Sequence, residues 1–188
     1  MTSDKLAEGA RAAHDLGLAT WLGGSTFGQV ALNPAVRKVS DKGERGQVVN
    51  AAWGGYNLIN MLSLAAVAIG WFGARLTESA PPQLTDREKR LAKAKDALTI
   101  AAVATGVASG VQGARLASEA PDGAVPIEGG TKPAEETPRS AARAQRGLRV
   151  SGPLNIISGV GLVIVNALLA QAAHSRPPLR RGLRRKSR

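Results

Sequence analysis

The sequence predicts an all-α membrane protein, a bundle of four transmembrane helices. The first observation behind this prediction is that Asp, Glu, Lys and Arg are absent from residues 16–36, 46–74, 97–114 and 150–175. A spanning helix needs roughly 20 apolar residues. A soluble chain with 21% charged residues is not expected to leave four gaps of about that length. The mean hydropathy of −0.08 hides the pattern because it averages over charged connections.

The second observation is that small and uncharged polar residues recur on one face of each stretch, read at 100° per residue. In the second stretch this face holds Asn50, Trp53, Asn57 and Asn60. Polar side chains inside a membrane are expected to face protein or water. The other residues that we expect in such a polar interior are Gln29, Gln112, Asn155 and Asn166. These faces have two interpretations, which are helix packing and a polar-lined cavity.

We expect the four spans at about 12–33, 48–75, 97–117 and 151–174. The second and fourth are strongly aliphatic, whereas the first and third are rich in Ala, Gly, Ser and Thr. An alternative is therefore two spans with two soluble amphipathic helices. A similar arrangement of the first and second helix pairs is consistent with two tandem two-helix hairpins.

Local signals predict where the helices end. The first helix is expected to stop at Asn33–Pro34, because the residue before proline is pushed out of the helical region. The second ends before Pro81–Pro82. The third begins at Thr85–Glu88, which has the pattern of a capping box, and its first three turns are expected to leave the membrane as a charged stalk. The fourth starts near Ser151–Pro153, with proline tolerated in the first turn.

Two segments are predicted to lie outside the helices. Residues 118–139 are rich in proline and glycine and are expected to form a flexible polar linker. Residues 176–188 are expected to form a disordered basic tail, which leaves residues 1–175 as the membrane domain. The first apolar stretch has no convincing cleavage site and is expected to stay in the mature protein.

The distribution of positive charge predicts the topology. The net charge is +11. The side that holds both termini carries 15 Lys and Arg residues against 10 on the other side, which favours cytoplasmic termini. The tail is expected to touch anionic lipid headgroups and not nucleic acid, because no aromatic residues interleave with its charges. The Arg-over-Lys bias and the abundance of Ala and Gly favour a bacterial plasma membrane.

The predicted spans contain few ionisable or metal-binding side chains. None has a well-buried Asp, Glu, Lys or Arg, which argues against ion-coupled or proton-coupled transport. The patterns Gly24-x-x-x-Gly28 and Gly106-x-x-x-Gly110 are typical of close helix contacts and allow a homo-oligomer. The chain has no cysteine and only two histidines and two methionines, so no metal site is predicted.

One short motif resembles a known family. His14, six further residues and Trp21-Leu22-Gly23-Gly24, with Pro34 ten residues later, resemble the first span of the copper-resistance D membrane family and its small relatives. The spacing is also similar to that in the membrane protoporphyrinogen oxidase family. The resemblance covers residues 10–38 and implies that His14 and Trp21 lie at a cofactor site, where His14 would be a haem ligand. His174, predicted on the same side, is a conceivable second ligand.

Three functional hypotheses follow. The first is a structural or accessory membrane bundle, and the second is a haem-binding or metal-binding membrane protein that uses His14. The third is a passive carrier of small solutes, which requires a continuous cavity at Asn57, Asn60, Gln112 and Asn155. An enzyme is not expected, since the sequence has no phosphate-binding loop, no nucleophile elbow and no pair of carboxylates within a span.

Overall fold

The computed structural model describes residues 2–76, 79, 84–120 and 124–174, so the basic tail lies outside the described residues. The described chain is mainly helical, as predicted, with one short antiparallel pair of strands. Its elements are α1 (Thr2–Phe27), η1 (Gly28–Leu32), α2 (Asn33–Ala35), η2 (Val36–Lys38), α3 (Lys42–Leu76), α4 (Asp86–Ser118), β1 (Ile127–Gly129), β2 (Lys132–Pro133) and α5 (Arg139–His174).

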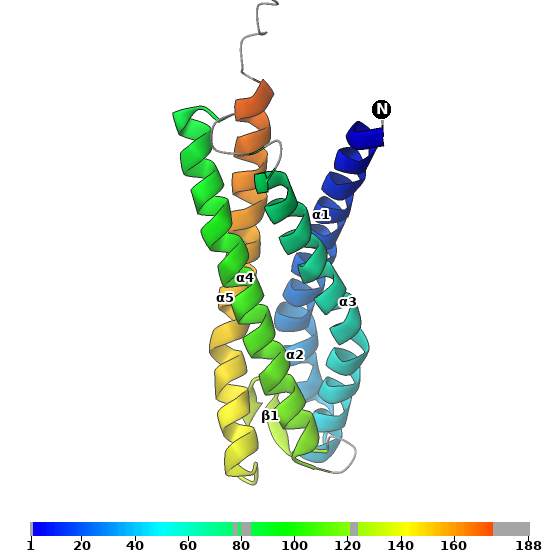
Figure 1. Ribbon diagram of the computed structural model, residues 1–188. Coiled ribbons are helices and arrows are strands. Elements are labelled where there is room, and N and C mark those ends of the chain that lie inside the picture. The colour runs from blue at the N-terminus through cyan, green and yellow to red at the C-terminus, as the bar shows by residue number, and fades with distance from the viewer. Residues whose placement is uncertain (1, 77–78, 80–83, 121–123, 175–188) are drawn as a thin grey trace, which may run out of the picture.

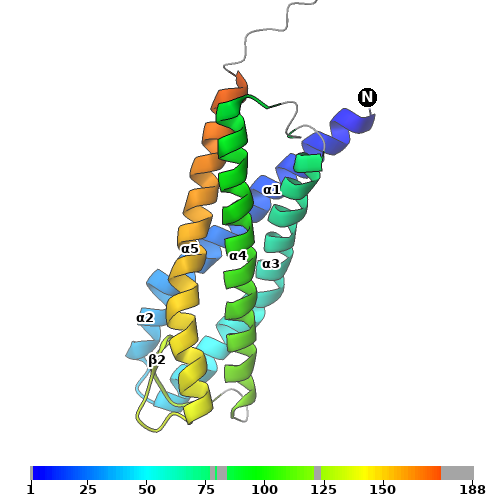
Figure 2. The ribbon, with the colours of Figure 1, turned by 60° about the vertical axis from the view of Figure 1, so that its left-hand side comes forward.

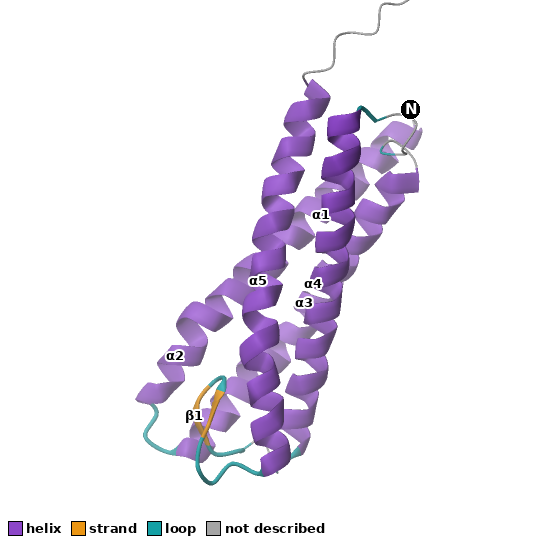
Figure 3. Cartoon of the chain, turned by 90° about the vertical axis from the view of Figure 1, so that its left-hand side faces the viewer, coloured by secondary structure: helices purple, strands orange, loops and turns teal. Residues whose placement is uncertain are grey.

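The four long helices are associated as two antiparallel pairs, α1 with α3 and α4 with α5 (Figure 1). Figure 2 shows α4 and α5 side by side along their length, while α1 crosses behind them at an angle. The start of α1, the end of α3, the start of α4 and the end of α5 lie at one end of the bundle, which we call the terminal end. The strands and α2 lie at the opposite end, which we call the strand end (Figure 3).

Three helices in the described part of the chain, α3, α4 and α5, are long and apolar enough to cross a membrane. Helix α1 is not one of them, because its first half carries charges and it ends at Phe27. The uncharged stretch 16–36 continues instead through η1 and α2. The first of the four predicted spans therefore stays a prediction.

The first helical segment does not stop at Asn33–Pro34 as predicted. Asn33 keeps helical angles, φ −59° and ψ −37°, and the backbone becomes extended only at Val39. The reason is the π-helical turn η1, in which the Asn33 N–H donates to the carbonyl of Gly28, five residues back. A π-bulge shifts the hydrogen-bond register just ahead of a proline ring that has no N–H to donate.

Helix α5 begins at Arg139, well before the predicted start near Ser151, and carries Pro153 in its interior. The added segment, 139–149, consists mostly of Ala and Arg, which favour helix. Ala141, Ala144 and Gln145 of this segment are buried at the strand end. The burial of these residues stabilises the extended helix and offsets the free energy lost because Pro153 has no N–H to donate.

The predicted flexible linker, residues 118–139, also contains ordered structure. Strands β1 and β2 pair within it, and Val125 and Ile127 are each 1% exposed. These two side chains join a cluster with Val36, Val49 and Ala141. Two buried aliphatic residues are enough to fix a segment whose proline and glycine content otherwise predicted mobility.

The predicted capping box is confirmed. The Thr85 side chain accepts a hydrogen bond from the backbone N–H of Glu88. The Glu88 carboxylate accepts one from the N–H of Thr85 at 2.8 Å. Helix α4 ends at Ser118, within one residue of the predicted end at 117.

The first turns of α4, predicted to leave the membrane as a charged stalk, pack against α3 and α5, which run beside them (Figure 2). Ala92, Lys95 and Thr99 are buried. The Lys95 ammonium lies 4.3 Å from the centroid of the Trp71 ring and donates to Asn166 Oδ1 at 2.7 Å. A long lysine side chain is therefore held inside the bundle at its terminal end.

The outside of the helices is more apolar than is usual for a soluble protein. Many large apolar side chains are exposed on the outside of the helices, while Ser, Thr, Asn and Gln are buried between them. The exposed ones are Leu16, Phe27, Val30, Val48, Leu58, Ile59, Met61, Leu62, Ile69, Phe72, Leu76, Ile100, Val107, Val111, Val150, Leu154, Ile157, Val160, Val163 and Ile164.

Candidate functional site

A cavity of about 310 Å³ lies between the two helix pairs, toward the strand end. An apolar cluster closes it on the terminal side, formed by Leu18, Trp21, Leu64, Val67, Ala102 and Leu162. A second apolar cluster closes it on the strand side, formed by Val36, Val49, Val125, Ile127 and Ala141. Within the described residues the cavity is therefore a chamber that lies between two apolar clusters.

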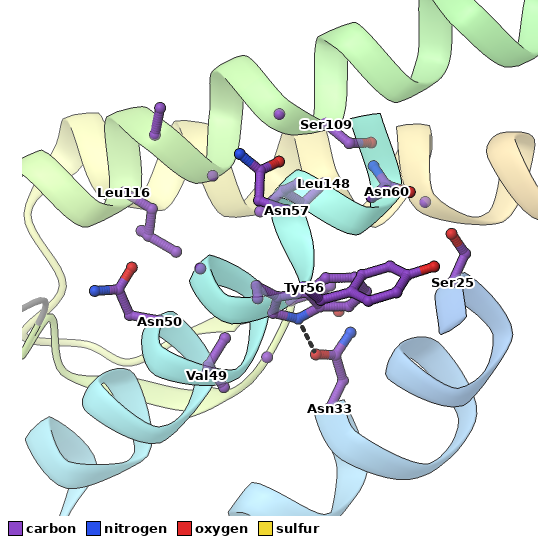
Figure 4. A pocket seen from close by; sticks show the side chains of 18 of the residues that line it. Ser25, Asn33, Val49, Asn50, Tyr56, Asn57, Asn60, Ser109, Leu116 and Leu148 are labelled. Atoms are coloured by element: carbon purple, nitrogen blue, oxygen red, sulfur yellow. Dashed lines mark hydrogen bonds between the residues drawn. The ribbon is translucent and has the colours of Figure 1, made fainter. Parts of the chain in front are cut away.

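The lining comes from every long helix and from the turn between the strands (Figure 4). It holds no Asp, Glu, Lys, Arg or His among the described residues. Uncharged polar and aromatic side chains supply its hydrogen-bonding groups, namely Ser25, Gln29, Asn33, Asn50, Trp53, Tyr56, Asn57, Asn60, Ser109, Thr131 and Asn155. Much of the remaining wall is glycine and alanine, which leave space where two helices would otherwise meet.

A hydrogen-bonded chain fixes one wall of the cavity. The indole N–H of Trp53 donates to Asn33 Oδ1 at 3.3 Å, as Figure 4 shows. Asn33 Nδ2 in turn donates to Gln29 Oε1 at 3.1 Å. Across the cavity, Asn155 Nδ2 donates to the carbonyl of Ala102 at 3.3 Å. These side chains are held in place by protein partners and shape the cavity.

Other polar groups at the cavity have no protein partner. Within the described residues, the side-chain amides of Asn50 and Asn60 and the hydroxyl of Ser25 make no hydrogen bond to another residue. All three groups line the cavity, Asn60 and Ser25 toward one side of the view in Figure 4 and Asn50 toward the other. Each amide offers two donors and an acceptor, so the cavity can bind a ligand through uncharged hydrogen bonds.

The cavity opens sideways between α3 and α4. Four of its lining residues are exposed, Gly54 and Asn57 on α3 and Gly110 and Ala114 on α4. At the strand end the lining residue Gly130 is buried, and its backbone N–H donates to the carbonyl of Asn33 at 3.3 Å. The mouth of the cavity is thus on the side of the bundle and not at its end.

Four of the six residues predicted for a polar interior line this cavity, and two do not. The four are Gln29, Asn57, Asn60 and Asn155. Gln112 packs instead against Gly147, beside the cavity. Asn166 lies beyond the terminal-side apolar cluster, where it donates from Nδ2 to Asp15 Oδ1 at 3.0 Å and accepts from Lys95.

Sequence reasoning missed three lining residues for identifiable reasons. Asn33 was interpreted as a helix stop, although it is a hydrogen-bonding residue within the continued helix. Thr131 fell in the predicted linker, which gave no sign that its turn reaches the cavity. Tyr56 is the only tyrosine in the chain, and its hydroxyl donates to the carbonyl of Thr20 at 2.8 Å. Only Tyr56 carried a usable signal, since it lies three residues from Trp53 on the same helix face.

His14 and Trp21 are both buried, at 5% and 0% exposure, but they are packing residues in this fold. His14 packs against Gly70, and its Nδ1 is 2.9 Å from the carbonyl of Val67. Trp21 belongs to the terminal-side apolar cluster. Neither residue lines the cavity. The Nε2 atom of His14 is buried and has no hydrogen-bond partner among the described residues, so the role of His14 as a haem ligand stays a prediction based on the motif.

His174 is exposed, and its Nδ1 is 2.9 Å from the carbonyl of Ala170 in its own helix. Over the described part of the chain, no group of three or more His, Cys, Asp or Glu side chains is placed to hold a metal ion.

Searches against protein-family models, curated proteins and solved structures find no match to this chain. The resemblance of residues 10–38 to the copper-resistance D membrane family therefore stays a prediction based on the motif alone.

Proposed function

We propose that this chain is an integral membrane protein with four spans, whose cavity binds a small uncharged polar group. The observation that carries the proposal is a cavity lined by neutral hydrogen-bonding side chains inside a bundle whose outer surface is apolar. An unpaired amide inside a membrane costs free energy unless it has a partner. A bound hydroxyl or amide group would supply a missing partner for the amide of Asn60 or for that of Asn50.

The lengths of the helices fit membrane insertion. Helices α3, α4 and α5 have 35, 33 and 36 residues, which is about 50 Å at 1.5 Å per residue. They exceed the roughly 30 Å of a hydrocarbon core, so both ends extend into the headgroup regions. We infer that the first span runs from α1 through η1 into α2. The excess of Lys and Arg on the terminal side favours cytoplasmic termini in a plasma membrane.

The cavity favours a small-molecule role over a purely structural one. Its volume corresponds to about ten water molecules at roughly 30 Å³ each. This is enough for a glycerol-like or sugar-like group. The absence of charge from the described lining disfavours ions, since a desolvated ion needs opposite charge or strong coordination. The apolar clusters on both sides favour a binding chamber over the passive carrier considered from the sequence.

The test is ligand-dependent thermal stability of the purified protein in detergent. Glycerol and a monoacylglycerol supply the neutral group in free and lipid-borne form, and their phosphorylated counterparts supply charged controls. We expect at least one neutral compound to raise Tm by about 5 °C near saturation and the charged counterparts to have no effect. Stabilisation by the charged compounds alone, or by none of the compounds, would contradict the proposal.

A pair of glycine variants assigns the effect to the cavity. A Cβ at Gly110, which lines the cavity, would meet no atom within 4 Å, so Gly110→Leu fills the mouth without a clash at the backbone. Gly55 is equally open and is not among the lining residues, so Gly55→Leu is the matched control. We expect Gly110→Leu to lose the ligand-induced stabilisation and Gly55→Leu to keep it.

A further inference from the structure

The side mouth of the cavity opens onto the part of the protein surface that would face lipid. Its exposed lining residues, Gly54, Asn57, Gly110 and Ala114, belong to α3 and α4 only. Around them the same two helices expose large apolar side chains, namely Leu58, Met61, Val107 and Val111. A ligand that passes this mouth therefore meets an apolar surface outside and a polar chamber inside.

Apolar residues of the described chain pack at both ends of the chamber. On the strand side Val125 and Ile127 are 1% exposed, and the turn at Gly130 packs on Asn33. On the terminal side Trp21, Val67 and Leu162 are each 0% exposed. Among the described residues, the exposed part of the cavity lining lies at the mouth between α3 and α4.

The depth of the mouth in the bilayer determines which kind of lipid headgroup can enter it. Asn57 lies nine positions inside the predicted start of its span at 48, and Gly110 lies seven positions from the end of its span at 117. At 1.5 Å per residue these separations are about 10 to 14 Å from the strand-side edge of the hydrocarbon. A charged phosphate headgroup is strongly disfavoured at that depth, whereas an uncharged hydroxyl-bearing headgroup loses much less hydration on moving there.

We propose that the ligand enters from the bilayer and is a lipid with an uncharged, hydroxyl-bearing headgroup, such as a diacylglycerol. The headgroup occupies the chamber, where the amide of Asn60 hydrogen-bonds its free hydroxyl group. The acyl chains leave through the mouth and lie on the apolar surface of α3 and α4. This inference rests on the proposed function and names the ligand class of the same cavity.

The chemistry of the chamber fits such a headgroup. The described lining has no charged side chain that would pair with a phosphate or an ammonium group. Its free amides and the Ser25 hydroxyl both donate and accept, as a glycerol hydroxyl does. The glycine at position 110 keeps the mouth wide enough for a chain to pass, since no atom lies within 4 Å of a Cβ placed there.

The experiment uses photoactivatable lipids with the full-length protein in phosphatidylcholine vesicles. One probe is a diacylglycerol with a diazirine near the headgroup, and the other has the same acyl chains with a phosphocholine headgroup. Cross-linked peptides are identified by mass spectrometry. We expect the diacylglycerol probe to label residues around the mouth, 50–61 and 106–114, at least about fivefold more than the phosphocholine probe. The reason is that an uncharged headgroup loses less hydration free energy than phosphocholine when it enters the chamber.

The glycine pair and an amide variant again provide controls. Gly110→Leu should reduce diacylglycerol labelling at the mouth to the level of the phosphocholine probe, while Gly55→Leu should leave it unchanged. Asn60→Leu removes one free amide and should also reduce it severalfold. Helix content and elution volume from gel filtration identify any variant that fails to fold, and Asn60→Ser then serves as the milder substitution.

Each other outcome overturns the inference. Equal labelling by both probes would mean that lipid merely surrounds the helices. Absence of labelling at 50–61 and 106–114, together with a dimer in gel filtration, would mean that a second copy covers the mouth. If free glycerol stabilises the protein but the diacylglycerol probe does not label the mouth, the lipid inference is wrong and the proposed function stands. If no neutral compound binds in either form, the proposed function fails as well.

Discussion

Single small residues determine how closely α1 and α3 approach. A Cβ added at Gly17 would lie 2.8 Å from the backbone carbonyl oxygen of Ser63 and 3.0 Å from the Cβ of Ala66. The first neighbour is backbone, which cannot rotate away as a side-chain end can. The two helices therefore touch at Gly17 because it has no side chain.

We predict that Gly17→Leu destabilises the protein by about 1 to 3 kcal/mol, because the helices must separate to admit the side chain. Gly23 lies on the same helix with nothing within 4 Å of an added Cβ. Gly23→Leu should be neutral or slightly stabilising, since leucine favours helix more than glycine does. Unfolding in a detergent titration measures both changes. Equal stability of the two variants would show that the contact at Gly17 does not limit the approach.

The residue types of the polar interior could be predicted from sequence, but their grouping could not. Asn57, Asn60 and Asn155 were expected inside because an amide in a span needs a partner, and they line the cavity. Asn166 was expected with them for the same reason but lies one apolar cluster away, beside Lys95. Periodicity gives the angle of a residue around its helix and not its depth, which depends on how the neighbouring helices are offset.

The glycine patterns also predicted which residues are small but not what lies opposite them. Gly24 and Gly28 pack against Tyr56 and Trp53, as expected of a close-contact motif. In the matching pattern on α4, Gly106 packs against Leu64, but Gly110 meets nothing and opens the cavity. A missing side chain allows either a contact or a void, and only the position of the second helix decides which one forms.

At the scale of elements, the segment between α4 and α5 closes the strand end of the bundle. Its apolar residues Val125 and Ile127 pack into the strand-side apolar cluster. Its exposed carboxylates form ion pairs with a lysine of α3. The Lys42 ammonium lies 3.0 Å from Glu128 and 3.1 Å from Glu136. Both carboxylates belong to the segment 118–139, which composition alone predicted to be flexible. A sequence pattern does not show which distant lysine a carboxylate will contact.

Acid should loosen this segment. A hydrogen bond from Lys42 lowers the pKa of Glu128 below its ordinary value of 4.5. A hydrogen bond from its own backbone amide, and then one from Lys42, lowers the pKa of Glu136. A carboxylate with a lowered pKa stabilises the folded state fully above its ordinary pKa, and this contribution is lost as the pH falls through the lowered value. The segment should therefore be held at neutral pH and released below pH 4.5.

Hydrogen exchange at residues 124–138, corrected for the intrinsic pH dependence of exchange, measures this release. We expect protection to fall as the pH drops below 4.5 in the native protein. In the Lys42→Gln variant protection should be lower at neutral pH and should change less with acid. Lys89→Gln, which removes the exposed pair with Asp86 near the terminal end, is the control and should leave the segment unaffected. Protection that is identical at neutral and acid pH would rule out a role for these ion pairs.

At the scale of the whole molecule, polar residues gather in three layers along the bundle. The charged groups around Lys95 and Asp96 lie toward the terminal end, where Arg75 pairs with Asp96 at 3.1 Å. The uncharged cavity lies in the half nearer the strands, and the Lys42 ion pairs lie at the strand end. Between the two charged layers the helices expose many large apolar side chains, as is typical of helices that face lipid.

The same layering predicts on which side of the membrane residues 5, 86 and 135 lie. Labelling these positions distinguishes three spans from four. The chain has no cysteine, so Lys5→Cys, Asp86→Cys and Glu135→Cys each carry a single thiol. If α1, η1 and α2 together cross the membrane, positions 5 and 86 lie on one side and position 135 on the other. With cytoplasmic termini, a membrane-impermeant maleimide should label Glu135→Cys in intact cells and the other two only after permeabilisation.

Labelling of Lys5→Cys together with Glu135→Cys, but not Asp86→Cys, would instead mean that α3, α4 and α5 cross while α1 stays on the strand side. Labelling of Lys5→Cys and Asp86→Cys alone would keep the four spans and reverse the orientation.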